Sequence, residues 1–586
     1  MAETLVLSLR NKDLQKENKI LLAGEWVFEK HNDELKNSSY QIFNSKSNLK
    51  KFREASTFET DKIYQKLCID LFKELNRLHS VNLDARSWKI IFGSWLRIFV
   101  AVCYERNFLI NEILDSHNIS KIYGVKSENF KFYSNGTAEQ RDQTGSHDWN
   151  NNLFHEIIDF NNYSVEKNFS SNNSTNNNNL IENLNNIVPR RKKILNFIEK
   201  IFEYFKYFRK KSDAIITRTG FSFFYEKIFE ILFFQVPQVY KSKGIEYKFY
   251  DDELRYKINL QYGKEKNIEN FIRKNLYKFL PVCIIESFTD IYEKCEKDYP
   301  SNPKFIMTAD AWEYDVNFKF YAAKKVNKGT PYFLFQHGNT YFTEDFFIKR
   351  VEYETAKKFF TFGYSKNIIT KNFCNHPTLG RNIKSKENGK LHLIAPFLQG
   401  RITPFEQSVE VFNSLKNIYK FEQKIDQNLK DKILLRSSKE FLQTSRGKWY
   451  AEKYFKNFKK NQIDYGLNNY TDNLKNSRIN IYFYDGTGIL DNLIYNIPTI
   501  GIWNNLYNHI DDEFIEKYKF LEEANIIFDD LDNMLIHLKN VWEDPESWWF
   551  SKRTQDNIKK FNYQFNTKGN ISSLHKLKNY VNDNLQ

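Results

Sequence analysis

Short apolar runs bounded by polar residues recur along the chain. The first two, TLVLSLR (residues 4–10) and KILLAGEWVF (19–28), have the continuous hydrophobicity of strands buried in a parallel sheet. Apolar positions at three- and four-residue spacing predict helices over residues 60–120. Further strand-like and helix-like runs then alternate: AIITRTGF (214–221), FYEKIFEILFF (224–234, helical), KFIMTAD (304–310), PYFLFQHG (331–338) and KKFFTFGYS (357–365).

The alternation restarts after HPTLGRNIKSKENGK (376–390), a polar stretch with proline and glycine breaks that is typical of a linker. Five more strand-like runs follow: LHLIAPF (391–397), KILLRSS (432–438), INIYFYDG (479–486), IPTIGIWN (497–504) and NIIFDD (525–530). Stretches of helical length separate most of them. Such alternation predicts an α/β fold of doubly wound, Rossmann-like domains.

We therefore expect two such domains that face a cleft. The N-terminal α/β domain covers 1–377 and carries extra helices, a linker spans 378–390, and the C-terminal domain covers 391–586, with its last helices packed back on the first domain. The Asn-rich stretch at 165–186 has the low complexity of a mobile insertion or loop.

Composition narrows the partners of the chain. The 586 residues include 87 Lys and Arg against 73 Asp and Glu, a formal charge of +14, which favours anionic partners. The basic residues are spread out, and no zinc-finger spacing, RNP-like signature or helix-turn-helix pattern is present, so we expect no nucleic acid partner. The remaining candidates for an anionic partner are the phosphates of a nucleotide sugar and an anionic membrane face.

Cysteine usage and the apolar segments predict a cytoplasmic location. The five cysteines are widely spaced without a CxxC pair, which indicates a reducing compartment. The first residues lack the basic and apolar regions of a signal peptide. The longest apolar stretch, IIFGSWLRIFVAVCY (90–104), is too short to span a membrane and contains Arg97, so we interpret it as a buried helix. Peripheral contact with the inner face of the plasma membrane fits the positive charge.

Polar residues directly follow the predicted strand at 331–335. In open α/β sheets, ligands bind beyond the carboxyl ends of the strands. A neutral imidazole there accepts a proton from an attacking hydroxyl, and glycine lets a substrate approach the backbone. His337 is therefore a candidate base, and Gln336, Gly338 and Asn339 are candidate substrate-binding residues. A tight turn whose histidine caps a neighbouring group explains the same pattern equally well.

Two carboxylates at other strand ends are further catalytic candidates. Asp310 follows the strand at 304–308, and Glu25 follows the second strand, beside Trp26 as a candidate substrate contact. A carboxylate near a histidine orients its tautomer or acts as a base itself. Helix capping is the commoner use of such residues and stays open as the alternative.

The second half of the chain offers a donor-binding set. Arg436 and Ser437 end a strand, where an arginine fork suits a phosphate and a surface ion pair is the alternative. Gly486, Thr487 and Gly488 form a small-residue turn before a helix, a favourable place for phosphate, although a capped helix start has the same pattern. Asp491 lies one helical turn beyond Thr487, so both side chains can face one ligand, with Asp491 on ribose or sugar hydroxyls.

Six segments in order over nearly the whole chain resemble a bacterial family of surface-carbohydrate transferases first defined in spirochaetes. They are LLAGEWVF, RSWKIIFGSWLRIFVAVCYERNF (86–108), HDWNNNLFHEII (147–158), PYFLFQHGNTYF with FFTFGYS, YDGTGILDNLIYNIPTIGIWN (484–504) and WWFSKRTQDNIKKF (548–561). A more distant similarity is to teichoic-acid-type glycerophosphotransferases and capsule Kdo transferases, which also carry an HG pair at a strand end.

The resemblance implies a GT-B-like fold and transfer of a sugar or sugar-like group from a nucleotide-activated donor. His337 would match the histidine of the HG pair, and Arg436, Thr487 and Asp491 would match the donor side. The chain departs from the family pattern at Asp491, where glutamate is more usual, and after Arg436, where proline and histidine are expected.

The leading functional hypothesis is a glycosyltransferase that builds a surface glycan or its precursor. The expected partners are a nucleotide-sugar donor as co-substrate and a glycan, lipid-linked or protein acceptor. No metal and no other cofactor are expected, because helix N-termini and basic residues can neutralise a leaving phosphate. The alternatives are a CDP-alcohol glycerophosphotransferase or a nucleotide-sugar epimerase on the same scaffold, and a non-catalytic scaffold protein of glycan assembly.

Overall fold

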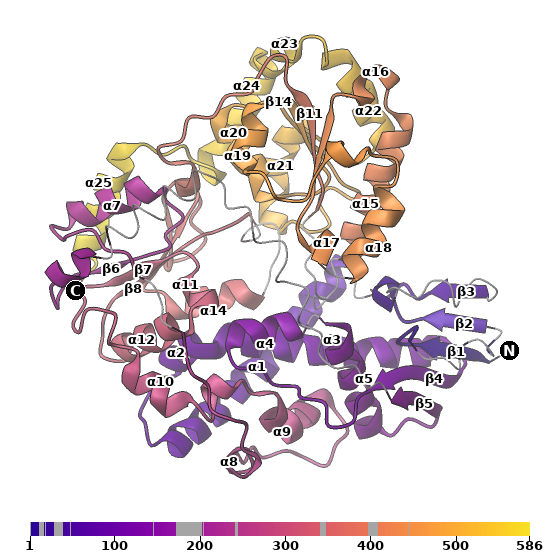
Figure 1. Ribbon diagram of the computed structural model, residues 1–586, viewed down its shortest axis with the longest axis vertical. Helices are drawn as coiled ribbons and strands as arrows, with labels where there is room; N and C mark the ends of the chain where they lie inside the picture. Colours follow the sequence, from indigo (N-terminus) through magenta and orange to yellow (C-terminus); the bar gives the residue numbers. More distant parts are fainter. Residues whose placement is uncertain are drawn as a thin grey trace.

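Helices and parallel sheets make up the computed structural model (Figure 1). It describes residues 2–585 except 11–13, 15–16, 18, 28–38, 47–48, 145, 172–201, 203, 241–243, 340, 342–346, 397–407 and 444. Every strand pair in this part of the chain is parallel. The predicted α/β class is confirmed, and the strands form three sheets.

The first sheet has the strand order β3-β2-β1-β4-β5. Its strands are β1 (Glu3–Val6), β2 (Lys19–Leu22), β3 (Ser39–Ile42), β4 (Ile119–Lys126) and β5 (Glu166–Ser171). The runs at 4–10 and 19–28 are strands as predicted. The Asn-rich stretch is not a loop throughout, because Glu166–Ser171 pairs with β4 in register. The rest of that stretch, from residue 172, lies outside the described residues.

The second sheet has the strand order β10-β9-β8-β7-β6. Its strands are β6 (Ile215–Ile216), β7 (Ile306–Thr308), β8 (Tyr332–Phe335), β9 (Lys358–Thr361) and β10 (Thr370–Asn372). Because successive side chains in a strand point to opposite faces, the apolar run of β8 serves two cores. Tyr332 and Leu334 pack into the largest core, with helices from the first half of the chain. Phe333 and Phe335 pack on the other face.

The third sheet has the order β13-β12-β11-β14-β15-β16, which is the classic doubly wound order. Its strands are β11 (Lys390–Ile394), β12 (Ile433–Arg436), β13 (Ile463–Asp464), β14 (Ser477–Tyr482), β15 (Thr499–Ile502) and β16 (Ile527–Phe528). The strand order reverses between β11 and β14, and ligands of such sheets bind outside the carboxyl ends at that switch point. The first two sheets both lie within the residues assigned to one N-terminal domain, and the domain boundaries stay a prediction.

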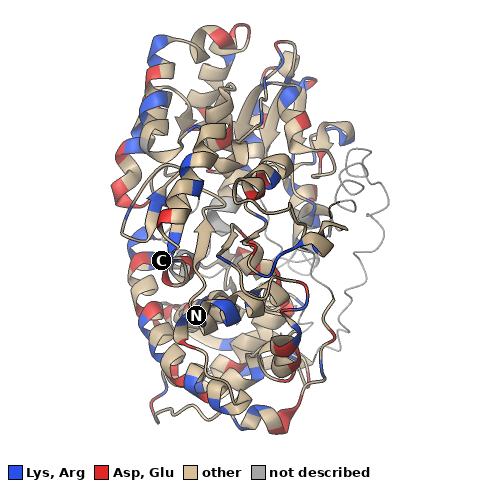
Figure 2. Cartoon of the chain, turned by 90° about the vertical axis from the view of Figure 1, so that its left-hand side faces the viewer, with Lys and Arg blue, Asp and Glu red and all other residues tan. Residues whose placement is uncertain are grey.

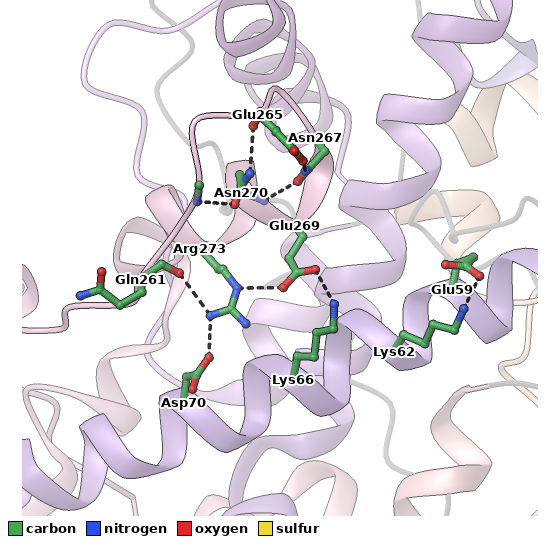
Figure 3. A network of polar contacts seen from close by, with 11 residues as sticks. Glu59, Lys62, Lys66, Asp70, Gln261, Glu265, Asn267, Glu269, Asn270 and Arg273 are labelled. Carbon is green, nitrogen blue, oxygen red and sulfur yellow. Dashed lines mark hydrogen bonds and ion pairs between the residues drawn. The ribbon is translucent and has the colours of Figure 1, made fainter.

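The helices of the first half lie below the third sheet in Figure 1. They are α1 (Lys50–His79), α2 (Ala85–Trp88), α3 (Ser94–Ser116), α4 (Thr137–Gln143), α5 (His147–Asn161), α7 (Phe223–Leu232), α8 (Asp252–Tyr256), α9 (Ile268–Phe279), α10 (Phe288–Lys294), α11 (Ala311–Tyr314), α12 (Val316–Val326) and α14 (Phe347–Thr355). Arg273 of α9 links to α1 through Asp70 at 2.7 Å and to Glu269 at 3.0 Å (Figure 3). Lys66 of α1 completes the network with Glu269.

The helices of the second half surround the third sheet, and the last one reaches the second sheet. They are α15 (Ser408–Lys424), α16 (Gln427–Lys430), α17 (Glu440–Gln443), α18 (Ser445–Tyr454), α19 (Tyr470–Lys475), α20 (Thr487–Tyr495), α21 (Asp512–Glu523), α22 (Leu531–Val541), α23 (Pro545–Trp549), α24 (Lys552–Phe565) and α25 (Ile571–Asp583). Leu574, Leu577 and Val581 of α25 share a core cluster with Phe333 and Phe335 of β8. The chain therefore connects the third sheet back to the second.

One described helical run, Ala85–Ser116, is long and apolar enough by length and composition to cross a membrane. It is longer than the 90–104 stretch suggested, but 83% of its apolar window is buried inside the fold. Arg97 in this run is paired with Asp61 and Glu354. The run is therefore a core helix, as interpreted from the sequence. Basic and acidic residues are interspersed along the chain on the side shown in Figure 2.

Candidate active site

The turn after β8 is fixed from within by Gln336. This side chain is fully buried. Its backbone N–H donates to the Phe360 carbonyl, its side-chain oxygen accepts from the Phe362 N–H, and its side-chain nitrogen donates to the Gly338 carbonyl, each at 2.8 Å. Gln336 therefore ties the end of β8 to the end of β9 and holds the turn that presents His337.

His337 belongs to a relay that the sequence did not reveal. Its Nδ1 lies 2.7 Å from the Tyr341 hydroxyl oxygen, and that hydroxyl donates to Oε1 of Glu352. Because the phenolic proton points at the carboxylate, the same oxygen accepts from Nδ1–H of His337. This arrangement places the proton on Nδ1 and leaves Nε2 as the basic nitrogen.

Burial protects this relay from water. The Glu352 side chain is 1% exposed, whereas that of His337 is 34% exposed. Burial, and then the neighbouring Glu352, hold the pKa of Tyr341 well above its usual value, so the phenol keeps its proton. Trp312 of α11 lies beside the imidazole, with ring centres 6.2 Å apart. The Glu352 end of the relay is thus buried and fixed, and the His337 end is accessible to solvent.

The turn after β8 docks on the turn after β14, in a different sheet. The Asn339 N–H donates to Thr487 Oγ1 at 3.1 Å. The Asn339 side-chain amide donates to the backbone carbonyl of Asp485 at 3.0 Å and to its carboxylate at 3.1 Å. A Cβ added to Gly338 would lie 3.3 Å from Thr487 Oγ1. The HG turn, which carries His337, and the predicted phosphate turn therefore meet.

Asp485 is the hub of this contact. Besides Asn339, its carboxylate accepts from the Tyr518 hydroxyl at 2.8 Å and lies 3.0 Å from His509 Nε2. The side chain is only 5% exposed. A buried carboxylate needs such donors, and here they come from α21, from the loop before it and from the HG turn. Asp485 thereby fixes the geometry between the two sheets.

The two glycines of the phosphate turn allow close packing at the start of α20. Gly486 is the N-cap of the helix, with extended backbone dihedrals. A Cβ at Gly488 would lie 2.6 Å from the Tyr482 hydroxyl and 2.7 Å from that of Tyr470. Only glycine fits this position without a shift of a buried tyrosine. The helix N-terminus carries partial positive charge and favours a phosphate.

Asp491 and Thr487 point their polar atoms at chain segments of the second sheet. Asn375, which follows β10, donates to Asp491 Oδ1 at 3.1 Å, as Asn339 does to Thr487. Burial raises the pKa of the Asp491 carboxyl to about 6, against the opposing effects of Asn375 and Arg381. The one-turn spacing does place both residues on one face of α20, and that face contacts the neighbouring unit.

The end of β12 holds a second set of polar groups. Arg436 donates to Asp464 at 2.6 Å and to the Asn468 carbonyl at 3.0 Å, and its side chain is 19% exposed. The Ser437 and Ser438 hydroxyls are buried and have no hydrogen-bond partner in the described part of the chain. Buried hydroxyls normally have partners, so these two are available for a ligand group beside a charged guanidinium.

The other predicted residues lie elsewhere. Asp310 forms a two-bond pair with Arg218 (2.8 and 3.1 Å), and the carboxylate behind His337 is Glu352 instead. Arg218 has a left-handed backbone (φ 49°). Glu25 lies near Lys453, whose pKa is lowered by burial, an effect that the Glu25 carboxylate opposes. Trp26 is 5% exposed and stacks on Phe154 in the core of the first sheet.

Sequence reasoning missed Tyr341, Glu352, Asp485, His509 and Tyr518. Tyr341 lies four residues after His337, which would place the two side chains near one another only if the turn led into a helix. Glu352 and Tyr518 lie within amphipathic helical patterns in which a polar residue normally faces solvent. Asp485 directly precedes the glycine turn and was the one member with a positional signal.

Comparison with known proteins gives one extended match. The chain matches the model of the LIC12162 family transferase over residues 3–579. None of the curated proteins matches it significantly. Among solved structures, it is similar to the S. aureus MnaA-UDP co-structure, with 12% sequence identity over 51% of this chain and 78% of the other, and a TM-score of 0.31. A likeness at that TM-score carries no argument about the site.

Proposed function

Because the chain belongs to the LIC12162 family of transferases, we propose that it transfers a sugar or sugar-like group from a nucleotide-activated donor to a surface glycan or its precursor. The family resemblance read from the sequence is thus confirmed at the level of a transferase. The glycosyl group, the donor nucleotide and the glycan acceptor belong to the proposal. So does a cytoplasmic location with peripheral contact to the inner face of the plasma membrane.

One observation carries the proposal: a histidine with an oriented tautomer stands where two parallel sheets meet at their carboxyl ends. Asn339 joins its turn to the glycine turn at the start of α20. A base from one sheet and a phosphate-binding helix start from another are the parts that a group transfer from a nucleotide needs.

The proposed reaction is a displacement at the sugar carbon that carries the nucleotide. The acceptor hydroxyl attacks that carbon, a new C–O bond forms, and the C–O bond to the phosphate breaks. His337 accepts the hydroxyl proton at Nε2 while the relay through Tyr341 holds Nδ1 protonated. Glu352, at 3.8 Å from Nδ1, stabilises the imidazolium that results.

The phosphate leaves with the bonding electrons and needs positive charge around it. In the proposal, Arg436, the buried hydroxyls of Ser437 and Ser438, and the N-terminus of α20 supply that charge and those donors. Among the described residues, no group of three His, Cys, Asp or Glu side chains is placed to hold a metal ion. Metal independence belongs to the proposal and is tested by activity in EDTA.

Donor turnover tests the proposal directly. The purified chain is incubated with UDP-, GDP-, CDP- and CMP-activated sugars, and release of the nucleotide is measured. One donor should be consumed, and His337→Ala should lower its turnover by about 10²–10⁴-fold, the usual contribution of a general base. His575→Ala, an exposed histidine on α25, is the matched control and should leave turnover unchanged.

The same assay separates the competing functions. For this purpose CDP-glycerol is added to the donors and the sugar products are analysed. Turnover of CDP-glycerol alone would replace the glycosyltransferase by a glycerophosphotransferase, and conversion of a nucleotide sugar to its epimer without nucleotide release would indicate an epimerase. Absence of binding to every nucleotide would favour a non-catalytic scaffold protein. Full turnover by His337→Ala would remove the histidine from the mechanism.

A further inference from the structure

A pocket opens at the carboxyl end of β4 in the first sheet. Its volume is about 620 Å³, within the range of small-molecule sites, about 300–1,000 Å³. Its walls come from the segment after β4, one face of α5, and the chain around α8 and the end of α9, all in the lower half of Figure 1. It shares no lining residue with the candidate active site.

The pocket adjoins, on its β4 side, the place where the topology of the first sheet favours a ligand. The strand order β3-β2-β1-β4-β5 reverses between β1 and β4, and ligands of open parallel sheets bind outside the carboxyl ends at such a reversal. Lys126 is the last residue of β4 and lines the pocket. The next residue, Ser127, is held by its N–H to the Asn152 side-chain oxygen at 2.9 Å, so the floor of the pocket is fixed to α5.

One wall is a preorganised pair of tyrosines. The rings of Tyr133 and Tyr250 are stacked, with centres 4.3 Å apart and planes at 17°. Arg255 covers both rings, at 4.3 Å from the centre of Tyr250 and 5.1 Å from that of Tyr133. This arginine is fully buried and is held by two bonds to Glu286 at 2.6 and 3.0 Å. Aromatic rings backed by a fixed cation lose little freedom when a ligand binds.

The rest of the lining combines two further tyrosine rings with balanced charge. Tyr256 is 64% exposed and its ring centre lies 5.1 Å from that of Tyr277. Lys278 pairs with Glu156 at 2.9 Å. The charged side chains of the lining are three basic and three acidic residues: Lys126, Lys131, Lys278, Glu128, Glu156 and Asp252. A site without excess positive charge does not favour a phosphorylated ligand.

We propose that this pocket binds an uncharged oligosaccharide. A sugar ring has an apolar C–H face that packs on an aromatic ring, and hydroxyls around its edge that bond to amide, imidazole and charged side chains, and the lining offers both kinds of group. His155 of α5 and the exposed Asn129 of the segment after β4 supply an imidazole and an amide to the lining. That this oligosaccharide is the acceptor, held at a distance from the reacting end, rests on the proposed function.

Binding to an array of uncharged di- to tetrasaccharides tests the inference. The full chain should bind at least one type of sugar on the array. Tyr256→Ala should bind that sugar about tenfold more weakly in calorimetry, because one aromatic stacking face is lost. Phe249→Ala is the matched control, since Phe249 is 96% exposed and outside the lining. It should bind as the unchanged chain does. Tyr256 is exposed, so its removal leaves the fold intact, and circular dichroism checks this.

Two measurements keep this inference apart from the proposed function. Tyr256→Ala should hydrolyse the donor at the normal rate when no acceptor is present. If the chain consumes the donor but binds no sugar on the array, the proposed oligosaccharide site is wrong and the proposed transferase activity is unaffected. Sugar binding that Tyr256→Ala does not weaken would also overturn the proposed oligosaccharide site. Sugar binding without donor turnover would uphold the pocket and reject the transferase.

Discussion

Replacing Tyr341 by phenylalanine removes one oxygen atom from the centre of the relay behind His337. The Tyr341 hydroxyl donates to the buried Glu352 and lies 2.7 Å from Nδ1 of His337. Without it, nothing in the described relay selects the Nδ1–H tautomer, and the two ends lose their link. The change should therefore reduce proton transfer at Nε2 while leaving the donor contacts on the third sheet untouched.

The size of the effect follows from the contact. A hydrogen bond to an ionised group contributes about 1.5–3 kcal/mol, which corresponds to a fall in kcat of about 10- to 150-fold. Glu352 is 1% exposed, so the loss of a donor should also cost about 1–3 kcal/mol of folding stability. Glu352→Gln keeps an oxygen that accepts from Tyr341, so its kcat should fall less.

Steady-state kinetics with the accepted donor provide the assay. Tyr341→Phe should lower kcat and leave the donor Kd unchanged, and the double variant with Glu352→Gln should lose less than the sum of the single losses, because both act through one relay. Tyr580→Phe on α25 is the control. If Tyr341→Phe keeps full kcat and loses only stability, or raises the donor Kd alone, the relay has no part in proton transfer.

Three further changes probe α20 and its contacts with the second sheet and within the third. Since burial raises the pKa of Asp491 from 3.8 to about 6, the folded state binds its proton more tightly and stability falls as the pH rises from about 4 to about 6. Asp491→Asn should abolish this pH dependence of stability. It should add at most about 3 kcal/mol to the free energy of unfolding measured in urea at pH 7.5, and it should weaken donor binding. An unchanged pH dependence would contradict the raised pKa of Asp491. Asn339→Ala removes the amide donors to Asp485 and the oxygen that accepts from the Thr487 hydroxyl and should lower kcat at least tenfold with a lower Tm, and an unaltered kcat would show that these side-chain contacts between the docked turns are not needed. Gly488→Ala puts a Cβ within 2.6 Å of a buried hydroxyl and should cost about 1–3 kcal/mol of stability, whereas a neutral result would mean that the helix start is loosely packed.

The pattern of apolar runs predicts strands correctly, but it does not predict which strands form one sheet. Each apolar run that was predicted to be a strand contains a strand of a parallel sheet, because continuous hydrophobicity suits burial on both faces. β4, ISKIYGVK, was not predicted, since its lysines and serine interrupt the run. The division into three sheets rather than two depends on which strands pair, and pairing over long distances leaves no local signal.

The candidate site, too, could be predicted from the sequence only in part. The positions after β8, β12 and β14 were marked by strand ends, and the structure joins two of them through Asn339 and Thr487. The partner of His337 was not predictable, because Glu352 reaches it through Tyr341 from a separate helix. The pairing of Asp310 with Arg218 likewise depends on β6 lying beside β7, which the sequence does not state.

The central claim is that a nucleotide-activated donor binds where the turns after β8 and β14 meet. Hydrogen–deuterium exchange of the full chain, with and without the accepted nucleotide, tests it most directly. The account predicts that the peptides containing Gly486–Gly488 and those containing His337–Asn339 both exchange more slowly when the nucleotide is bound. Peptides around Tyr250 at the first sheet should not change. Saturable nucleotide binding with protection confined to any other part of the chain would contradict it.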